Sequence, residues 1–412
     1  MRKKIVIFGF GSRGKMCGEY VKVCPEEFEL VAIIEKKVQR IDIAREMFPD
    51  VKIFTDYKEF ISLKLSADIV MVATQDQDHK DHAIDMMRAG YDLLLEKPIA
   101  NTKEDCYAIY QESIKTGRNV VVCHVLRYSP FYSKIKKLIV DGILGDVITI
   151  NASENVGYFH QAHSFVRGPW RREDESSAMI LAKCCHDMDI IRYLMDEKCI
   201  SVNSYGALNF FKEKNAPQDA TTYCSDCPHE DCIYKAQTLY TAEGVKSWFA
   251  NYFSNRVGNN EGVLQDLYHT QYDKCVFKTD NDVVDHQSTI IQFEKGKTAC
   301  HTMTAFSRET YRDIKIHGTK AELYGMMEDS FIEVRPYGGE PYKVDCDISE
   351  AIVGGHSGSD YFMLKNLYKA LNGEKVDGIT YLSVSLESHL MCFSAEESRL
   401  EKGNTKYIVI DK

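Results

Sequence analysis

Long hydrophobic runs are absent from this chain of 412 residues. No stretch approaches the roughly 18 consecutive apolar residues of a membrane-spanning helix, so we expect no membrane partner. Runs of lysine and arginine with interleaved aromatic residues are missing too, and the formal net charge is -10, which argues against a nucleic-acid partner. Only 9 prolines occur, with no internal repeat and no low-complexity tract, so no flexible linker is expected. We therefore expect a soluble, cytoplasmic globular protein.

The composition indicates more than one hydrophobic core. Hydrophobic residues make up 44% and charged residues 27%, the balance of an ordinary globular protein. Because 412 residues exceed what a single core usually holds, we expect two domains. The 14 cysteines are scattered apart from one cluster, which is typical of buried thiols in a reducing cytosol. The basic start precedes only a short apolar run, which predicts a first strand and not a signal peptide.

An apolar run at residues 5–8 leads straight into a glycine triplet, Gly9-x-Gly11-x-x-Gly14. Gly9 permits a tight turn, Gly11 lets a pyrophosphate approach the backbone, and Gly14 lets the next helix pack on the strand. The first N–H groups of that helix would face the phosphates. A second strand ends at Glu35, where a carboxylate would bond the adenosine ribose. This context predicts dinucleotide binding over an ordinary strand–turn–helix, with contacts from Gly9, Phe10, Gly11, Ser12, Arg13, Gly14 and Glu35.

Strand and helix patterns alternate along the first part of the chain. Strand-like runs occur at 5–8, 30–34, 52–54, 69–73, 92–95 and 119–123. Helical patterns occur at 39–47, 57–63, 79–89 and 103–116. Alternation of this kind requires right-handed crossovers and a parallel sheet covered on both faces. We therefore predict an α/β Rossmann domain, a doubly wound parallel sheet, over residues 1–124.

Residues 125–412 have a different pattern. Period-two runs occur at 147–153, 201–210, 288–293, 298–305, 313–317, 321–325 and 331–336, with helices at 185–194 and 361–371. This predicts an α+β domain with a mostly antiparallel, open sheet. The free face of such a sheet suggests a homodimer or homotetramer. Residues 208–285 form an irregular insertion rich in Tyr, Asn and Cys.

Two strands of the first domain end in polar side chains. Parallel strands end at the ligand crevice, so Thr74 and His79 are expected beside the cofactor, with a capped helix start as the alternative. The fifth strand ends in Glu96-Lys97-Pro98. Near a positively charged nicotinamide, like-charge repulsion and desolvation would lower the pKa of Lys97, which suits proton exchange with a sugar hydroxyl. A surface lysine that caps the next helix is the alternative.

The glycine triplet, Ala73-Thr74, His79 and Glu96-Lys97-Pro98 together resemble the Gfo/Idh/MocA oxidoreductases, which include glucose–fructose oxidoreductase and inositol dehydrogenases. The resemblance extends over nearly the whole chain. It implies that Lys97 assists proton transfer and that the glycine turn, with neighbouring residues, holds NAD(P).

The residues at the end of the second strand bear on the choice of cofactor. A carboxylate at Glu35 would repel the 2′-phosphate of NADP, so NAD is expected and NADP is less favoured. The positive charges of Lys36 and Lys37, next to Glu35, would instead favour the 2′-phosphate of NADP.

The family also carries an Asp-x-x-x-His motif on a helix of the second domain, where the histidine acts at the reacting hydroxyl. Here His186 and Asp189 fit the pattern, but Ala182 stands at the position of the aspartate, with Lys183 beside it. The resemblance implies that His186 is an acid/base and that Lys183, His186 and Asp189 contact the substrate. Lys183 would suit a more acidic or differently oriented substrate. A core histidine is the alternative for His186.

Further residues are candidates for ligand contacts. Trp170 and Arg171 are similar to Trp-Arg pairs that line the cofactor in some relatives, and Arg167 precedes them as a candidate for substrate hydroxyls. Arg127 and Tyr128 follow the sixth strand at the domain junction, as candidates for cofactor and substrate respectively.

One further stretch has two interpretations. Residues 355–360 resemble a Gly-His-Gly-Gly-x-Asp stretch of some relatives. Either they contact a ligand or they only start the helix that follows.

A cysteine cluster stands apart from this pattern. Cys224, Cys227 and Cys232 have a spacing that suits tetrahedral zinc, with His229, Cys185 or Cys275 as candidates for the fourth ligand. Reduced thiols in a tight loop are the alternative, or a disulfide in an oxidising compartment. An iron–sulfur cluster is less favoured because the run holds no fourth cysteine.

Three functions follow. The first is an NAD-dependent oxidoreductase in which Lys97 and His186 move the proton of a secondary hydroxyl on a sugar, sugar derivative or cyclitol. The second is an NAD-dependent glycosidase that oxidises the sugar transiently and eliminates the aglycone. The third is a non-catalytic ligand-binding or assembly protein on the same fold.

Overall fold

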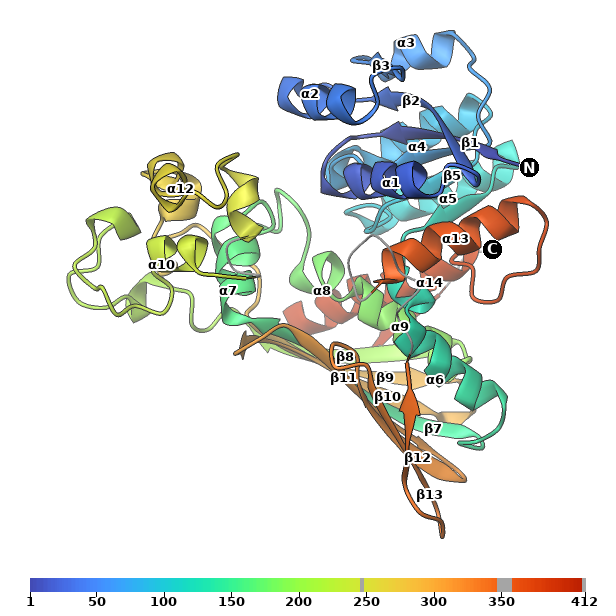
Figure 1. The fold of residues 1–412 in the computed structure, drawn as a ribbon. Helices are drawn as coiled ribbons and strands as arrows, with labels where there is room; N and C mark the ends of the chain where they lie inside the picture. The colour runs from blue at the N-terminus through green and yellow to red at the C-terminus, as the bar shows by residue number, and fades with distance from the viewer. Residues whose placement is uncertain (245–247, 347–357, 410–412) are drawn as a thin grey trace.

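The computed structural model describes residues 1–244, 248–346 and 358–409 (Figure 1). The first part of the chain is a six-stranded parallel sheet in the order β3-β2-β1-β4-β5-β6. Its strands are β1 (Lys3–Phe8), β2 (Phe28–Ile34), β3 (Lys52–Phe54), β4 (Ile69–Val72), β5 (Leu93–Leu95) and β6 (Val120–Val122). This order is that of a doubly wound dinucleotide-binding sheet, which confirms the predicted Rossmann fold.

The strands of this sheet are apolar along their length because both faces are buried. In β1, Ile5 and Ile7 belong to one hydrophobic core, and Val6 and Phe8 belong to another on the opposite face. The helices that connect the strands are α1 (Ser12–Val23), α2 (Val38–Met47), α3 (Tyr57–Ser62), α4 (His79–Arg88) and α5 (Lys103–Thr116). All strands therefore end at one edge, where the polar residues gather.

The second part contains a nine-stranded sheet in the order β14-β13-β12-β11-β7-β10-β9-β8-β15. Its strands are β7 (Val147–Gly157), β8 (Cys199–Ala207), β9 (His286–Phe293), β10 (Thr298–Ser307), β11 (Tyr311–Gly318), β12 (Ala321–Met326), β13 (Phe331–Pro336), β14 (Tyr342–Asp345) and β15 (Lys406–Tyr407). Only β7 and β10 pair in parallel, so the sheet is mostly antiparallel, as predicted.

One face of the second sheet is buried and the other is exposed. Burial alternates strictly along β9. The outward side chains include Ile148, Ile290 and Phe306, which are 47%, 57% and 49% exposed. A homodimer or homotetramer that covers this face stays a prediction.

Helices α9 (Cys185–Met195), α13 (Ser359–Leu371) and α14 (Leu382–Leu400) lie between the two sheets (Figure 1). The leucines at one side of α14 join the core of the first domain, so this helix, although it lies near the end of the chain, connects the two domains. Helices α14 and α6 (Pro130–Val140) are absent from the sequence prediction.

The insertion at 208–285 has its own apolar cluster, which includes Phe211, Tyr240 and Phe277. It contains the short helices α10 (Ala236–Thr241) and α12 (Asn260–Leu267) and lies to one side of the two sheets (Figure 1). Segments α7 (Tyr158–His160) and the π-helix η3 (Gln161–Arg167) pack against its apolar cluster, and α8 (Met179–Ala182) follows them in the chain. No helix among the described residues is long and apolar enough to span a bilayer.

Candidate active site

The turn after β1 has no room for side chains. Gly9 has φ +96°, and a Cβ there would lie 2.4 Å from the carbonyl oxygen of Ala73. A Cβ at Gly14 would lie 2.0 Å from the carbonyl oxygen of Gly9. Gly11 precedes α1 without a side-chain cap, so the first N–H groups of the helix face outward toward a ligand. The turn therefore fits the pyrophosphate of a dinucleotide.

Glu35 is held at the end of β2 by backbone N–H groups. Its Oε2 accepts a hydrogen bond from the N–H of Phe10 at 2.8 Å, and its Oε1 accepts from the N–H groups of Lys36 and Lys37 at 2.8 and 2.9 Å. Arg40, which the sequence analysis missed, lies 3.6 Å from Glu35 and borders Gly11. The carboxylate is thus fixed beside the glycine turn, where a ribose would lie.

The Lys97 loop is tied to the protein from both sides. The Lys97–Pro98 peptide is cis. The ring of His79 lies 2.8 Å from the carbonyl oxygen of Pro98, and the N–H of Ile99 donates to Nε2 of His389 at 2.9 Å. His79 is fully buried and supports this loop, and its contact with the cofactor stays a prediction.

The Lys97 amine reaches the second domain. Its Nζ donates to the carbonyl oxygen of Ala182 at 3.0 Å. Ala182 is the last residue of α8. His186 follows four residues later, near the start of α9. The structure therefore brings Lys97 to the segment that carries His186.

Two further predicted cofactor residues, Arg13 and Glu96, bond to one another. Arg13 Nε donates to Glu96 Oε1 at 2.7 Å, and Arg13 Nη2 donates to Asp360 Oδ1 at 2.7 Å. These pairs join the glycine turn to β5 and α13. Asp360 belongs to the stretch at 355–360, of which residues 355–357 lie outside the described residues.

The segment after η3 reaches the end of β4. The indole Nε1 of Trp170 donates to Asp76 Oδ2 at 3.3 Å. The neighbouring Thr74 hydroxyl lies 3.0 Å from Nδ1 of His82. Trp170 and Thr74 therefore both lie beside the end of β4, and their contacts with the cofactor stay predictions.

Arg167 and Arg171 both bond to residues of the insertion. Arg167 is fully buried and donates to the carbonyl oxygens of Lys274 and Tyr234, both at 2.7 Å. Arg171 pairs with Asp280 and Glu175. Both guanidinium groups therefore bind protein groups, and the contacts of Arg167 with substrate and of Arg171 with cofactor stay predictions.

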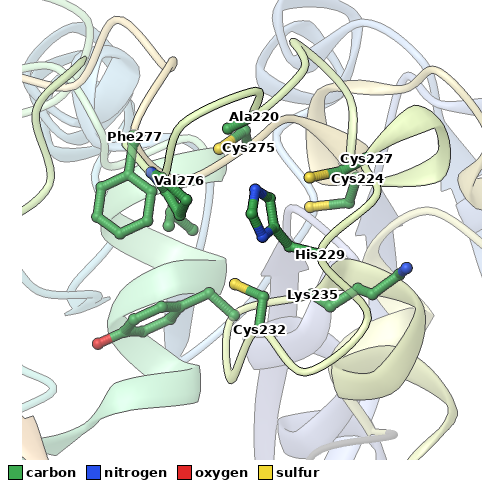
Figure 2. Close-up of a pocket in the computed structure, with 11 residues that line it drawn as sticks. Ala220, Cys224, Cys227, His229, Cys232, Lys235, Cys275, Val276 and Phe277 are labelled. Atoms are coloured by element: carbon green, nitrogen blue, oxygen red, sulfur yellow. The ribbon is translucent and has the colours of Figure 1, made fainter. Parts of the chain in front are cut away.

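The cysteines of the insertion line one small cavity (Figure 2). Cys224, Cys227 and Cys232 are joined there by Cys275 and His229. Cys185 lies elsewhere, on α9.

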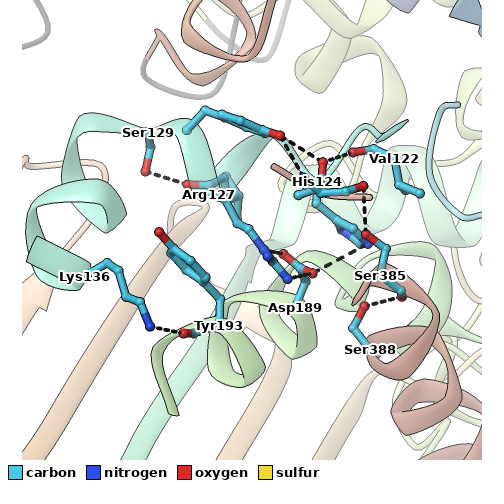
Figure 3. A network of polar contacts seen from close by, with 12 residues as sticks. Val122, His124, Arg127, Ser129, Lys136, Asp189, Tyr193, Ser385 and Ser388 are labelled. Atoms are coloured by element: carbon cyan, nitrogen blue, oxygen red, sulfur yellow. Dashed lines mark hydrogen bonds and ion pairs between the residues drawn. The ribbon is translucent and has the colours of Figure 1, made fainter. Parts of the chain in front are cut away.

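Arg127 and Asp189 form a buried ion pair (Figure 3). Arg127 Nε and Nη2 each donate to Asp189 at 2.6 Å. The ring of His124 lies 3.9 Å from Asp189, and its centroid is 5.7 Å from that of His186. Both side chains therefore position the surroundings of His186, and the contacts of Arg127 with cofactor and of Asp189 with substrate stay predictions.

Tyr128 and Lys183 also have partners within the protein. The Tyr128 hydroxyl lies 3.0 Å from the Thr380 hydroxyl and accepts from the Thr380 N–H, so it packs the domain junction, and its contact with a substrate stays a prediction. Lys183 is 3.2 Å from Glu154, which also pairs with Arg312. The charge of Lys183 is therefore balanced by protein.

Histidines around the site are kept neutral. Burial lowers the pKa of His163 and His389 to about 3 and also lowers the pKa of His124, His160 and His301. Such rings carry no positive charge near pH 7.

These shifts predict acid sensitivity. Below about pH 6.5 these histidines become protonated in the unfolded chain but stay neutral in the folded protein. Their contribution to the free energy of unfolding is therefore full above that pH and falls as the pH decreases toward 3. We expect His163 and His389, with a pKa of about 3, each to cost about 1.4 kcal/mol of unfolding free energy between pH 7.5 and 5.5, measured by urea unfolding. In His389→Gln the loss of unfolding free energy between pH 7.5 and 5.5 should be smaller by about 1.4 kcal/mol, the contribution of one histidine. An identical difference in both proteins would contradict the prediction.

Two family models match the chain. The model described as an oxidoreductase family with an NAD-binding Rossmann fold matches residues 3–124. The C-terminal alpha/beta domain of the same family matches residues 136–381.

Individual proteins are similar as well. The oxidoreductase-named protein YteT of Bacillus subtilis (strain 168) is 26% identical over 395 residues, which cover 89% of this chain and 88% of YteT. An inositol 2-dehydrogenase of Klebsiella pneumoniae is 25% identical over 208 residues, or 49% of this chain and 57% of that protein. The solved structure of levoglucosan dehydrogenase with NADH and levoglucosan covers 99% of both chains with a TM-score of 0.73 and 16% identity, which indicates the shared fold.

Proposed function

Because the chain belongs to the Gfo/Idh/MocA family of oxidoreductases, we propose that it is an NAD-dependent dehydrogenase acting on a secondary hydroxyl of a sugar, sugar derivative or cyclitol. The observation that carries the proposal is the contact of Lys97 Nζ with Ala182, 3.0 Å away, which places an amine beside the segment of His186. Relatives named inositol 2-dehydrogenase support this substrate class.

Lys97 and His186 would share the hydroxyl proton. Bound NAD supplies the hydride acceptor. The substrate hydroxyl would replace the Ala182 carbonyl as the partner of the Lys97 amine, with His186 as the second acid/base. Glu35 and the glycine turn would hold the adenosine end of the cofactor, and His79 and His389 would keep the Lys97 loop in position.

Substrate screening tests this function. The purified chain is mixed with NAD and a panel of sugars, amino sugars, cyclitols and glycosides, and absorbance is followed at the reduced-nicotinamide band. We expect a sustained rise in this absorbance with at least one secondary alcohol. Absence of turnover across the whole panel would contradict the proposal.

A second candidate, NAD-dependent glycoside cleavage by transient oxidation, uses the same residues. One relative, 29% identical over 189 residues, has the name 2,7-anhydro-N-acetylneuraminate hydratase, which describes no net oxidation. Aglycone release from a glycoside, with retained NAD and no net NADH, would favour this candidate. Solvent deuterium at the carbon beside the oxidised one would distinguish it from simple hydrolysis.

The negative charge of Glu35 is expected to favour NAD over NADP. Glu35→Gln keeps an acceptor for the Phe10 N–H but removes the charge. Because like charges about 4 Å apart repel by up to about 4 kcal/mol near a protein surface, we expect the affinity for NADP relative to NAD to rise at least roughly tenfold. Calorimetric titration with each coenzyme measures this ratio.

The control for this variant is Glu29→Gln, on the same strand, where the carboxylate pairs with Arg2 at the surface. It should keep the wild-type ratio. An unchanged ratio in Glu35→Gln would show that this carboxylate does not face the 2′ position.

A further inference from the structure

The cavity in the insertion is lined by the thiols of four cysteines: Cys224, Cys227, Cys232 and Cys275 (Figure 2). It holds about 20 Å³ for a water-sized sphere, which is room for one water or one metal ion. All 14 cysteines of the chain are free thiols, so no disulfide consumes these four. The cavity therefore presents one type of ligand from several directions.

Local backbone structure brings these cysteines together. Cys224 begins a single 3-10 turn, and the N–H of Cys227 donates to its carbonyl oxygen at 3.2 Å. Tyr223 forms an isolated β-bridge with Lys274, and the N–H of Cys275 donates to the carbonyl oxygen of Thr222 at 2.9 Å. Cys275 is thus fixed beside Cys224, although the two are far apart in sequence.

A buried positive charge, the guanidinium of Arg167, lies beside the cavity. Arg167 is fully buried, and its Nη2 lies 3.5 Å from Sγ of Cys224. In the described part of the chain, no carboxylate lies within ion-pair distance of Arg167. The stem of Lys235, 7% exposed, lines the same cavity. A buried cation without a counter-ion is costly, and thiolates would balance it.

We propose that this cavity is a structural zinc site with Cys224, Cys227, Cys232 and Cys275 as its four ligands. Zinc with four thiolates carries a net charge of about −2, of which Arg167 would offset one unit, since Lys235 already pairs with Glu230 at 2.6 Å. In this structure no three of the four sulfurs, all on described residues, lie within 4.8 Å of one another, so metal binding would draw them inward to about 2.3 Å from the ion. Four protein ligands close the coordination sphere, so the ion holds structure and takes no part in hydride transfer.

Other candidate ligands fit less well. Nε2 of His229 lies 2.7 Å from the carbonyl oxygen of Gln218, so only Nδ1 could face an ion, and the four thiols already complete a tetrahedral set. Cys185 lies on α9 near Lys97 and not at this cavity. A separate group, Cys184, Asp187 and His301, has ligand atoms within 4.8 Å of one another, but Asp187 is bonded to Arg312, whose charge would repel a metal ion.

The site would also support the active site. Arg167 ends η3, and Trp170 follows three residues later with its contact to Asp76. Zinc that fixes Cys232 and Cys275 would therefore fix the nearby carbonyls of Tyr234 and Lys274 that hold Arg167 and, through it, the position of Trp170.

Metal analysis of the full chain, purified without chelator or affinity metal, tests the proposal. We expect one zinc ion per chain, close to zero in Cys275→Ser, and one in the control Cys300→Ser, an exposed cysteine on β10. His229→Ala should keep zinc. Zinc retained by Cys275→Ser, or lost in His229→Ala, would overturn the ligand set.

A second measurement does not depend on the folding of a variant. A thiol-reactive mercurial added to the wild-type chain should release one zinc ion per chain, detected with a chromophoric chelator, and Co²⁺ added after zinc removal should produce intense thiolate-to-cobalt absorption. Iron with acid-labile sulfide, or a reduced chain that holds no metal and does not bind added Zn²⁺, would overturn the proposal.

Discussion

Lys97→Met is expected to lower kcat by about 10²- to 10⁴-fold, the usual contribution of a general acid/base. The amine lies 3.0 Å from Ala182 and has no carboxylate partner that would substitute for it among the described residues. NAD affinity should change far less, because the glycine turn and Glu35 are untouched. Steady-state kinetics with the substrate found by screening, together with NAD calorimetry, separate the two effects.

The arginine variant distinguishes proton transfer from charge alone. Lys97→Arg keeps a cation, but a guanidinium does not lose its proton in proteins, so it should not restore the rate. Lys115→Met, on the exposed side of α5, is the matched control and should keep wild-type kcat. A wild-type rate in Lys97→Arg would show that the amine acts only as a positive charge.

Asp189→Asn is expected to destabilise the fold by about 3–5 kcal/mol, because it leaves the Arg127 guanidinium buried without its counter-ion. Both side chains are almost fully buried, at 4% and 1% exposure. Urea unfolding followed by circular dichroism measures the loss.

Two further variants test the cause. Replacing both partners by leucine removes the buried charge as well as the pair, so stability should recover much of the way toward wild type. Asp141→Asn breaks the exposed pair with Lys137 and should cost less than about 1 kcal/mol. If Asp189→Asn costs no more than Asp141→Asn, the ion pair does not contribute as described.

The sequence predicts the first domain well because its signals are local. Continuous apolar strands, the glycine triplet and the helix at Lys103–Thr116, with a capping threonine before it and a glycine after it, need no knowledge of distant residues. Helix α14 escapes prediction because it is buried on several sides, including Ser385, Ser388 and His389, so it lacks the polar stripe that marks a surface helix.

The candidate site is predictable in part for the same reason. Lys97, Glu35 and the glycine turn follow from strand ends, and the resemblance points to His186. The pairings of Arg127 with Asp189 and of Arg167 with the insertion depend on residues far apart in sequence, so charge type alone suggests ligand contacts that the fold uses for packing. The same distance leaves Cys275 as one of three candidates until the fold places it beside Cys224.

Calorimetric titration of the purified chain with NAD, after removal of any co-purifying nucleotide, tests most directly that a dinucleotide binds along the turn after β1. We expect saturable binding of one NAD per chain and weaker binding of NADP. No heat with either coenzyme, together with no nucleotide released when the purified protein is denatured, would contradict the account.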